Sequence, residues 1–432
     1  MNENELMSYM KVSKAVATMA IPSVISSLVT VVYNMADTFF VGQTGDPLQV
    51  AAVSLTNPIF ILFMAFANMF GMGGSAAASI AMGEKNEKRM KNVSSFITYA
   101  SFIVGIFFAV ILLIFSKPIL QIFGANNQTY DLAYGYLFHI SYGAPFIIWS
   151  AASFVVRSEG ASKEAMIGTI VNIVLDPIMI IGLHMGAAGA AIATTIGNIL
   201  ASLYYVWYFI KKSNYFSIHP RYFKWNNKIL TSVCSSGFPT AIFSVLMSVS
   251  TIVLNQILVV YGNVPVAAIG IVFKANMFIT FLQMGLANGV QPLLGYNFGS
   301  GDIKRFREVE SYTKKCCLIV GIIATLLYFI FRTQIIVIFI SDSEVINYGI
   351  LMLIGYMISG PVIGLLFVNM NCMQSVGRAL SATILSVLRQ GVLLIPMLYI
   401  LNAIAGLHGV IYGQALTDYI AVILSAYLWR KV

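Results

Sequence analysis

The stretch VSSFITYASFIVGIFFAVILLIF, residues 93–115, contains no charged side chain. A run of about 20 apolar residues is long enough to cross the hydrocarbon core of a membrane as an α-helix. The stretch lacks the alternation of a transmembrane β-strand, and backbone groups in lipid must be paired internally. It therefore predicts a membrane-spanning helix and sets the class of the protein.

The rest of the chain has the same character. Of its 432 residues, 59% are hydrophobic and only 9% are charged, and the mean hydropathy is +0.84, whereas water-soluble domains are about 25% charged. We predict an all-α integral membrane protein with about twelve transmembrane helices. The expected spans are 15–42, 50–82, 93–115, 131–156, 165–183, 187–210, 229–260, 264–297, 309–331, 345–373, 382–401 and 407–429.

The net charge of +9 is distributed by topology. When the spans are numbered in order, 21 of the 25 basic residues lie before the first span or after an even-numbered one. Basic residues concentrate on the cytoplasmic side of membrane proteins. The pattern predicts a multi-pass protein of the cytoplasmic membrane with both termini in the cytoplasm, and it argues against a nucleic-acid partner.

The chain repeats itself at a shift of about 216 residues. Ile21-Pro22 matches Phe238-Pro239, Lys88-Arg89 matches Lys304-Arg305, and Pro145 matches Pro361. We predict an N-lobe of six spans (1–210), a charged cytoplasmic linker (211–228) and a C-lobe of six spans (229–432). Two such lobes can rock about a central site to give alternating access, and we expect the protein to function as a monomer surrounded by membrane lipid.

Five charged residues fall well inside predicted spans: Asp37, Asp176, Lys274, Arg389 and Asp418. A charge inside the hydrocarbon region is costly, so such residues are usually functional or paired. The match to the repeat is lost at the first two, because the C-lobe has apolar residues at the equivalent positions. The two acids are therefore the main chemical difference between the lobes.

Each of these acids has polar neighbours in the sequence. Tyr33 and Asn34 precede Asp37 by one helical turn. Asn172 and Asp176 are four residues apart and share one helix face. Pro177 cannot donate to the carbonyl of Ile173, which frees an acceptor close by, and the next span carries Thr194, Thr195 and Asn198.

Carboxylates, an amide and a hydroxyl form a plausible site for a proton or a monovalent cation such as Na⁺. The alternative is that both acids are structural and are satisfied by Asn and Tyr donors. For Arg389 and Asp418, on adjacent helices of the C-lobe, we expect a structural ion pair. Pro22, in the middle of a span, predicts a helix kink, and Lys274 fits a cavity or a packing position equally well.

Candidates for a substrate cavity share an apolar or amide character along span 8 and facing spans. Met and aromatic walls suit hydrophobic ligands of varied shape, although such a helix face is more often simple packing. The candidates are Met64, Trp149, Lys274, Phe278, Phe281, Met284, Asn288 and Gln291.

Over its whole length the chain resembles the MATE (multidrug and toxic compound extrusion) transporters. The resemblance rests on Asn34…Asp37-Thr38-Phe39-Phe40-Val41-Gly42, on Asn172-Ile173-Val174-Leu175-Asp176-Pro177, on Gly186-Ala187-Ala188-Gly189, and on Gln291-Pro292-Leu293. It implies twelve helices in two lobes and cation-coupled antiport. The sequence is most similar to the MepA-like multidrug exporters of the DinF-like branch.

In that branch the coupling site lies in the N-lobe. The resemblance places it at Asp37, Asn172, Asp176 and Thr194, with Tyr33 and Asn34 beside them, and gives Pro22 the role of bending point. The acids that the NorM-like branch has in spans 7 and 10 are absent here, so no C-lobe sodium site of that kind is expected.

The sequence thus predicts a non-enzymatic antiporter without a cofactor. It would export hydrophobic or cationic drugs in exchange for H⁺ or Na⁺. Three alternatives remain open at this stage: a flippase for lipids or lipid-linked precursors, for which Lys274 and Arg389 could meet a phosphate, a channel, and a scaffold protein.

Overall fold

The computed structural model describes residues 5–42, 47–123, 125–159, 167–225, 227–340 and 342–431. Every regular element in these ranges is helical. The elements are η1 (Glu5–Tyr9), α1 (Val12–Gly42), α2 (Pro47–Gly83), α3 (Glu87–Ile114), α4 (Ser116–Ile122), α5 (Tyr130–Trp149), α6 (Ala152–Ser158), α7 (Ile167–Pro177), η3 (Ile178–Gly182), α8 (Gly186–Lys211), η4 (Pro220–Tyr222), α9 (Asn227–Val259), α10 (Asn263–Gly299), α11 (Ile303–Ile330), α12 (Arg332–Val337), α13 (Ser343–Met357), α14 (Gly360–Ser375), α15 (Ala379–Val387), η5 (Leu388–Leu393) and α16 (Leu394–Arg430).

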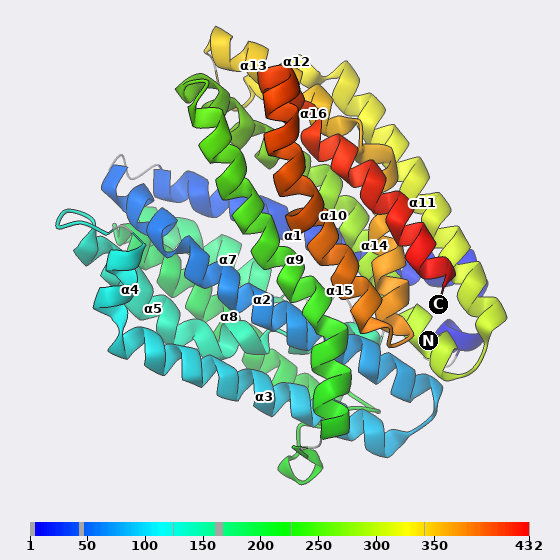
Figure 1. The fold of residues 1–432 in the computed structure, drawn as a ribbon. Helices are drawn as coiled ribbons and strands as arrows, with labels where there is room; N and C mark the ends of the chain where they lie inside the picture. The colour runs from blue at the N-terminus through cyan, green and yellow to red at the C-terminus, as the bar shows by residue number, and fades with distance from the viewer. Residues whose placement is uncertain are drawn as a thin grey trace. The chain divides into compact units, whose positions relative to one another are not determined.

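The twelve predicted spans are confirmed as helices or helix pairs. Within the described residues, nine helices are long and apolar enough to cross a membrane, and α13 with α14 forms a further span bent by 47°. Ala379–Arg430 counts once among the nine although Gly406 interrupts the helix (φ 56°, ψ −139°). Figure 1 shows this segment rising through α15 and returning to the C-terminus as the second limb of α16. The remaining span, α7 with η3, is the shortest.

Short helices and helix starts differ from the prediction. The spans expected at 93–115 and 309–331 begin six residues earlier, because Asn86 and Asp302 cap α3 and α11 by accepting from Arg89 N (3.0 Å) and Arg305 N (2.9 Å). The short helices α4 and α12, which follow α3 and α11 after Phe115 and Phe331, were not predicted. Both caps and both breaks are 216 residues apart, so the internal repeat is present in local structure as well as in sequence.

The chain forms two compact units, which we describe separately. Unit 1 comprises Met1–Leu28 and Phe238–Val432, and unit 2 comprises Val29–Gly237. The chain crosses between them inside α1 and inside α9, and each of these helices contains a proline, Pro22 or Pro239. The lobe limits inferred from the repeat, 1–210 and 229–432 with a linker at 211–228, remain a prediction.

In unit 2, α5 packs against α3 and α8, and α7 packs against α8 (Figure 1). Small residues permit these close approaches. A side chain on Gly105 would meet the backbone of Pro145 at 2.3 Å, and one on Gly197 would meet Gly168 O at 3.1 Å. Close helix packing through small residues is a main source of association inside membranes, where the hydrophobic effect does not drive helices together.

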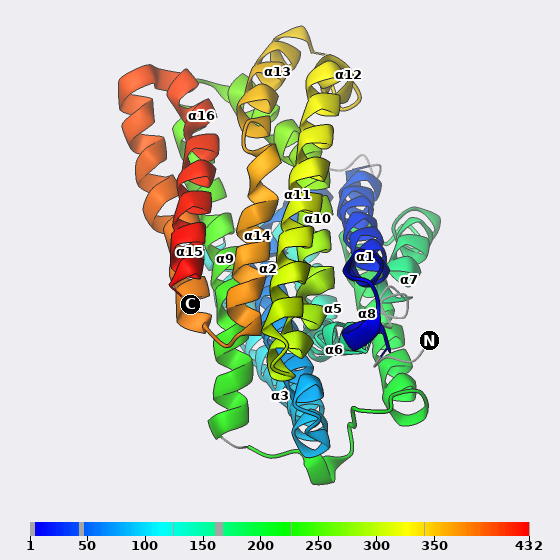
Figure 2. The same cartoon turned by 90° about the vertical axis from the view of Figure 1, so that its right-hand side faces the viewer.

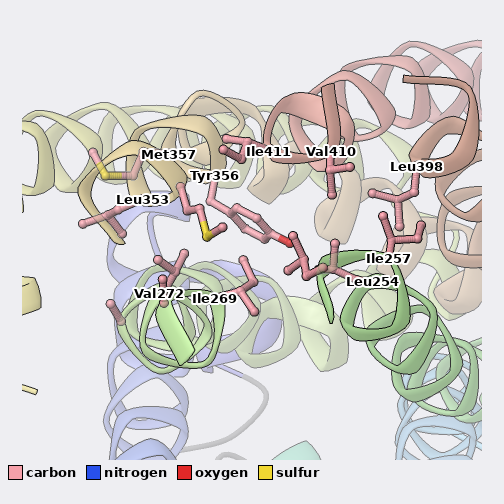
Figure 3. Close-up of a cluster of buried hydrophobic side chains, with 14 of the residues drawn as sticks. Leu254, Ile257, Ile269, Val272, Leu353, Tyr356, Met357, Leu398, Val410 and Ile411 are labelled. Atoms are coloured by element: carbon pink, nitrogen blue, oxygen red, sulfur yellow. The ribbon is translucent and has the colours of Figure 1, made fainter. Parts of the chain in front are cut away.

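Unit 1 is organised around α10, which packs against α11, α13 and α14 (Figure 2). Its apolar core joins side chains of α9, α10, α13 and α16. Leu254, Ile269, Leu353 and Val410 are each at most 5% exposed in this core, and Tyr356 lies among them (Figure 3).

The first half of α1 belongs to unit 1 because it packs on α10. A side chain on Gly285 would meet Val24 Cα at 2.9 Å, and one on Gly289 would meet Ser23 Cβ at 2.7 Å and Ala20 Cα at 2.8 Å. Two glycines four residues apart form the small-xxx-small surface that lets membrane helices approach closely.

Candidate functional site

The polar cluster predicted in the fifth span is formed by α7 and α8 of unit 2. Asn172, Asp176 and Thr194 are 4%, 0% and 5% exposed. The amide orientation that satisfies its neighbours has Asn172 Nδ2 donating to Asp176 Oδ2 (3.2 Å), while Asn172 Oδ1 accepts from Thr194 Oγ1 (3.3 Å). Asn198 Nδ2 donates to Thr194 O (2.8 Å). The structure therefore brings the carboxylate, the amide and the hydroxyl together as the sequence predicted.

Glycines position this cluster. The Cβ of Asn172 lies 3.2 Å from where a side chain on Gly197 would begin, and Gly168 faces Ala201 in the same way. α7 and α8 therefore approach closely enough for their short polar side chains to meet.

The end of α7 is irregular. Pro177 lacks the N–H that would bond to Ile173 O, and the chain continues as a single π-helical segment, η3. Such segments often mark functional positions in helices. The chain then turns through His184 and Gly186, with φ of 54° and 52°, and Ala187 N donates to Gln49 Oε1 of α2 (2.8 Å).

The second predicted acid is placed only by its backbone. Helix α1 runs without interruption through Pro22 to Gly42. The side chains of Tyr33, Asn34 and Asp37 lie outside the part of the structure that is described, so their contacts with the cluster, and the Pro22 bend, remain predictions. Asp37 and Asp176 do belong to the same unit.

The charged pair of the C-lobe is an ion pair inside unit 1. Arg389 Nε donates to Asp418 Oδ1 at 2.8 Å, and the two side chains are 7% and 3% exposed. Gln414 Nε2 donates to the same oxygen (3.0 Å). The guanidinium lies 5.2 Å from the ring centre of Phe243 and 5.9 Å from that of Phe367. Aromatic faces and a second donor thus satisfy a charge pair that would otherwise be costly in the membrane.

This ion pair occupies the helix pair that corresponds to α7 and α8. Gly406 repeats the positive φ of Gly186 at a shift of 220 residues, and η5 repeats the π-helix η3. The same shift relates Gln414 to Thr194 and Asp418 to Asn198. The sequence analysis missed Gln414, Phe243 and Phe367. The spacing of Gln414 and Asp418 could have indicated the first of them, but the rings come from distant helices.

The amides predicted to line a cavity form a ladder between α10 and α14. Asn371 Nδ2 donates to Asn288 Oδ1 (3.0 Å), and Gln291 Nε2 donates to Gln374 Oε1 (3.0 Å), whose Nε2 donates to Thr240 (3.1 Å). Gln291 is 1% exposed, which favours a packing role for it, whereas Asn288 is partly buried.

The other cavity candidates divide between the units. Met64 and Trp149 lie in unit 2, and Phe278, Phe281, Met284 and Lys274 lie in unit 1. Trp149 is buried, and its indole N–H has no hydrogen-bond partner among the described residues. Lys274 is exposed although it lies roughly 16 Å along α10 at 1.5 Å per residue. A lysine at such depth avoids lipid and faces either a partner or water.

A repeated bundle of spanning helices with a buried carboxylate cluster has the architecture of a secondary transporter. The profile of the MatE family matches residues 22–181 and 239–400. The chain therefore belongs to the MatE family, as the sequence motifs predicted, and is a multi-pass membrane protein.

Relatives and solved structures agree with this assignment over the whole chain. "Multidrug export protein MepA" of Staphylococcus saprophyticus is 33% identical, with all of this chain and 97% of the relative covered. The protein of the same name from Staphylococcus aureus (strain MRSA252) is 33% identical over 97% of this chain and 94% of its own length.

The twelve-helix, two-lobe fold is shared with MATE structures. The outward-facing conformation of a multidrug resistance MATE family transporter matches with a TM-score of 0.94 at 24% identity, covering 100% of this chain and 98% of the other. A MOP superfamily transporter from Pyrococcus furiosus Vc1 matches with a TM-score of 0.93 at 25% identity and the same coverage.

Proposed function

We propose that this protein exports hydrophobic and cationic drugs by alternating access, in exchange for H⁺ or Na⁺ entering the cell. Membership of the MatE family and full-length similarity to two proteins named multidrug exporters support the substrate class. The observation that carries the coupling is the buried cluster of Asn172, Asp176 and Thr194. A fully buried carboxylate between spanning helices needs a proton, a cation or donors to be stable.

Asp176 and Asp37 would take the coupling cation from outside. Oxygen ligands suit both a proton and Na⁺, and Asp176, Asn172 and Thr194 supply a carboxylate, an amide and a hydroxyl within hydrogen-bond distance of one another. Neutralising the acids would change the packing of α1, α7 and α8 and release the drug outward. Coupling requires that cation and drug oppose each other's binding.

The orientation follows from charge. The basic ends of the spans would lie in the cytoplasm, with both termini there, and the protein would work as a monomer in the cell membrane. The drug would be held by adaptable side chains: Met64 and Trp149 from one unit, and Phe278, Phe281, Met284 and Asn288 from the other. The buried indole N–H of Trp149 is an available donor for a polar group of the drug.

Efflux of a cationic dye from proteoliposomes tests the proposal. A pH gradient and a Na⁺ gradient are imposed separately, and the dye is loaded on the side of the basic loops. We expect dye transport against its gradient with at least one ion, and none with neither. Transport that follows only the dye's own gradient, without counterflow, would indicate a channel.

Lys274 supports one alternative, a flippase for lipids or lipid-linked precursors. Its exposed ammonium inside a spanning helix could meet a phosphate. Movement of a fluorescent anionic lipid between leaflets, together with the absence of dye efflux in the same vesicles, would favour this alternative.

A further inference from the structure

A basic hollow lies at one end of unit 2, where the loop after α2 meets the first turns of α3 and α9. Its volume is about 420 Å³. Its rim carries the cations Lys88, Arg89 and Lys228, and Asn86, Asn92 and Ser232 add amides and a hydroxyl. None of the described residues that line it is acidic. The hollow therefore combines positive charge with neutral donors, which is the chemistry that binds a phosphate.

Nearby acids leave part of this charge uncompensated. Glu84 takes Arg89 in a two-oxygen ion pair (2.8 and 2.7 Å), and Glu87 pairs with Lys91 (3.3 Å). Neither acid lines the hollow. Lys88 and Lys228 thus contribute net positive charge from two different helices, and an anion placed between them would face both.

The hollow lies at the level of lipid headgroups. Both α3 and α9 are membrane-spanning helices, and the hollow is at the end where each begins. Beside it, Trp225 is 63% exposed and its ring lies 5.9 Å from that of the buried Phe96. Exposed tryptophans collect at the membrane interface. Farther along α3, Ile103, Phe107 and Ile114 form an exposed apolar surface for acyl chains.

The floor of the hollow is apolar, formed by Val93 and Ile229. A ligand that fits has an anionic head and hydrocarbon attached to it. We propose that the hollow binds the phosphate headgroup of an anionic phospholipid, such as phosphatidylglycerol, in the leaflet on the basic side of the membrane. A free phosphate would use the rim but not the interfacial position.

The second repeat differs at the matching position. Arg305, the counterpart of Arg89, donates Nε to Met7 O (3.0 Å) and Nη2 to Met10 O (2.7 Å). The N-terminal segment therefore takes up this cation. Lys304, the counterpart of Lys88, is exposed on the same side of the chain but does not line the hollow. It provides a control that is matched by the repeat itself.

The test uses the full chain purified in detergent and examined by native mass spectrometry with added phosphatidylglycerol or phosphatidylcholine. The Lys88→Gln/Lys228→Gln variant is compared with Lys304→Gln/Lys224→Gln, which removes two exposed lysines outside the hollow. We expect the first pair to lose about tenfold in retention of phosphatidylglycerol, since each lysine near an anionic lipid contributes several-fold, while the control pair retains it. Lys88→Arg/Lys228→Arg should restore binding.

Three results would overturn the proposal. The first is an equal loss in both glutamine pairs, which would mean diffuse surface attraction. The second is retention of phosphatidylcholine as strong as that of phosphatidylglycerol. The third is binding of inorganic phosphate, measured by titration calorimetry, as tight as that of the lipid. All four substituted lysines are exposed, and matching elution profiles establish that each variant is folded.

Discussion

Asn172 Nδ2 lies 3.2 Å from Asp176 Oδ2 on the same face of α7. The amide donates to a carboxylate that is fully buried between two spanning helices. Hydrogen bonds to charged groups contribute about 1.5–3 kcal/mol. This contact therefore stabilises the ionised form of the acid, which is the form that must exist after the coupling cation has left.

Replacing this amide should slow the transport cycle. In Asn172→Ala the ionised carboxylate loses a donor, so it should release its cation less readily, and we expect gradient-driven dye efflux to fall by about tenfold, as the loss of one charged hydrogen bond implies. Initial efflux rates in proteoliposomes measure this. Asn276→Ala, a partly buried amide on α10 of the other unit, is the control, and an equal fall in both variants would contradict the assignment.

The ion pair of Arg389 and Asp418 should stabilise unit 1 only as a pair. Asp418→Asn leaves the guanidinium buried without its counterion, and breaking a buried pair in this way costs about 3–5 kcal/mol. We expect a clear fall in the melting temperature of the purified protein. Adding Arg389→Gln should recover part of the loss, and strictly additive losses would argue against a coupled pair.

The contact of α1 with α10 depends on the absence of a side chain at Gly289. Its Cβ would lie 2.7–2.8 Å from Ser23 and Ala20, and overpacking of this kind costs about 1–3 kcal/mol. We expect Gly289→Ala to lower the melting temperature. Gly270→Ala on the same helix meets no atom within 4 Å, so it should be neutral or slightly stabilising. Similar melting temperatures for the two variants would contradict the packing described here.

Glu159 should make stability depend on pH. It lies one residue beyond the span ending at Ser158. Burial raises its pKa above the ordinary value, although hydrogen bonds from Ser213, Tyr208 and the Tyr215 N–H lower it. The native state then holds the proton more tightly than the unfolded state. The stability from this group is full below the unfolded pKa of about 4.3 and is lost as pH rises through the raised native pKa.

Glu159→Gln keeps the neutral shape and removes the titration. Unfolding of the variant, followed by intrinsic fluorescence between acid and neutral pH, should therefore show a smaller loss of stability with rising pH than the wild type. Glu308→Gln, an exposed acid of α11, should leave the wild-type slope unchanged. A slope that stays the same in Glu159→Gln would show that other groups produce it.

Hydropathy and the repeat predicted the twelve spans, because in lipid each span must be a continuous apolar helix. The grouping of Asn172, Asp176 and Thr194 was also predictable, since four-residue spacing places the first two on one face. The rings of Phe243 and Phe367 around Arg389 were not, because they approach from α9 and α14 through tertiary packing. For the same reason, the packing of the first half of α1 on α10 could not be read from a repeat boundary.

The coupling role of the two acids is tested most directly by transport in two modes. Asp37→Asn, Asp176→Asn and the control Asp131→Asn, an exposed acid in the first turn of α5, are reconstituted at equal density. Dye efflux driven by an ion gradient is then compared with dye counterflow without a gradient. We predict that each of the first two variants loses gradient-driven efflux but retains counterflow, while Asp131→Asn keeps both. Normal gradient-driven efflux in Asp37→Asn and Asp176→Asn would contradict the proposed coupling site.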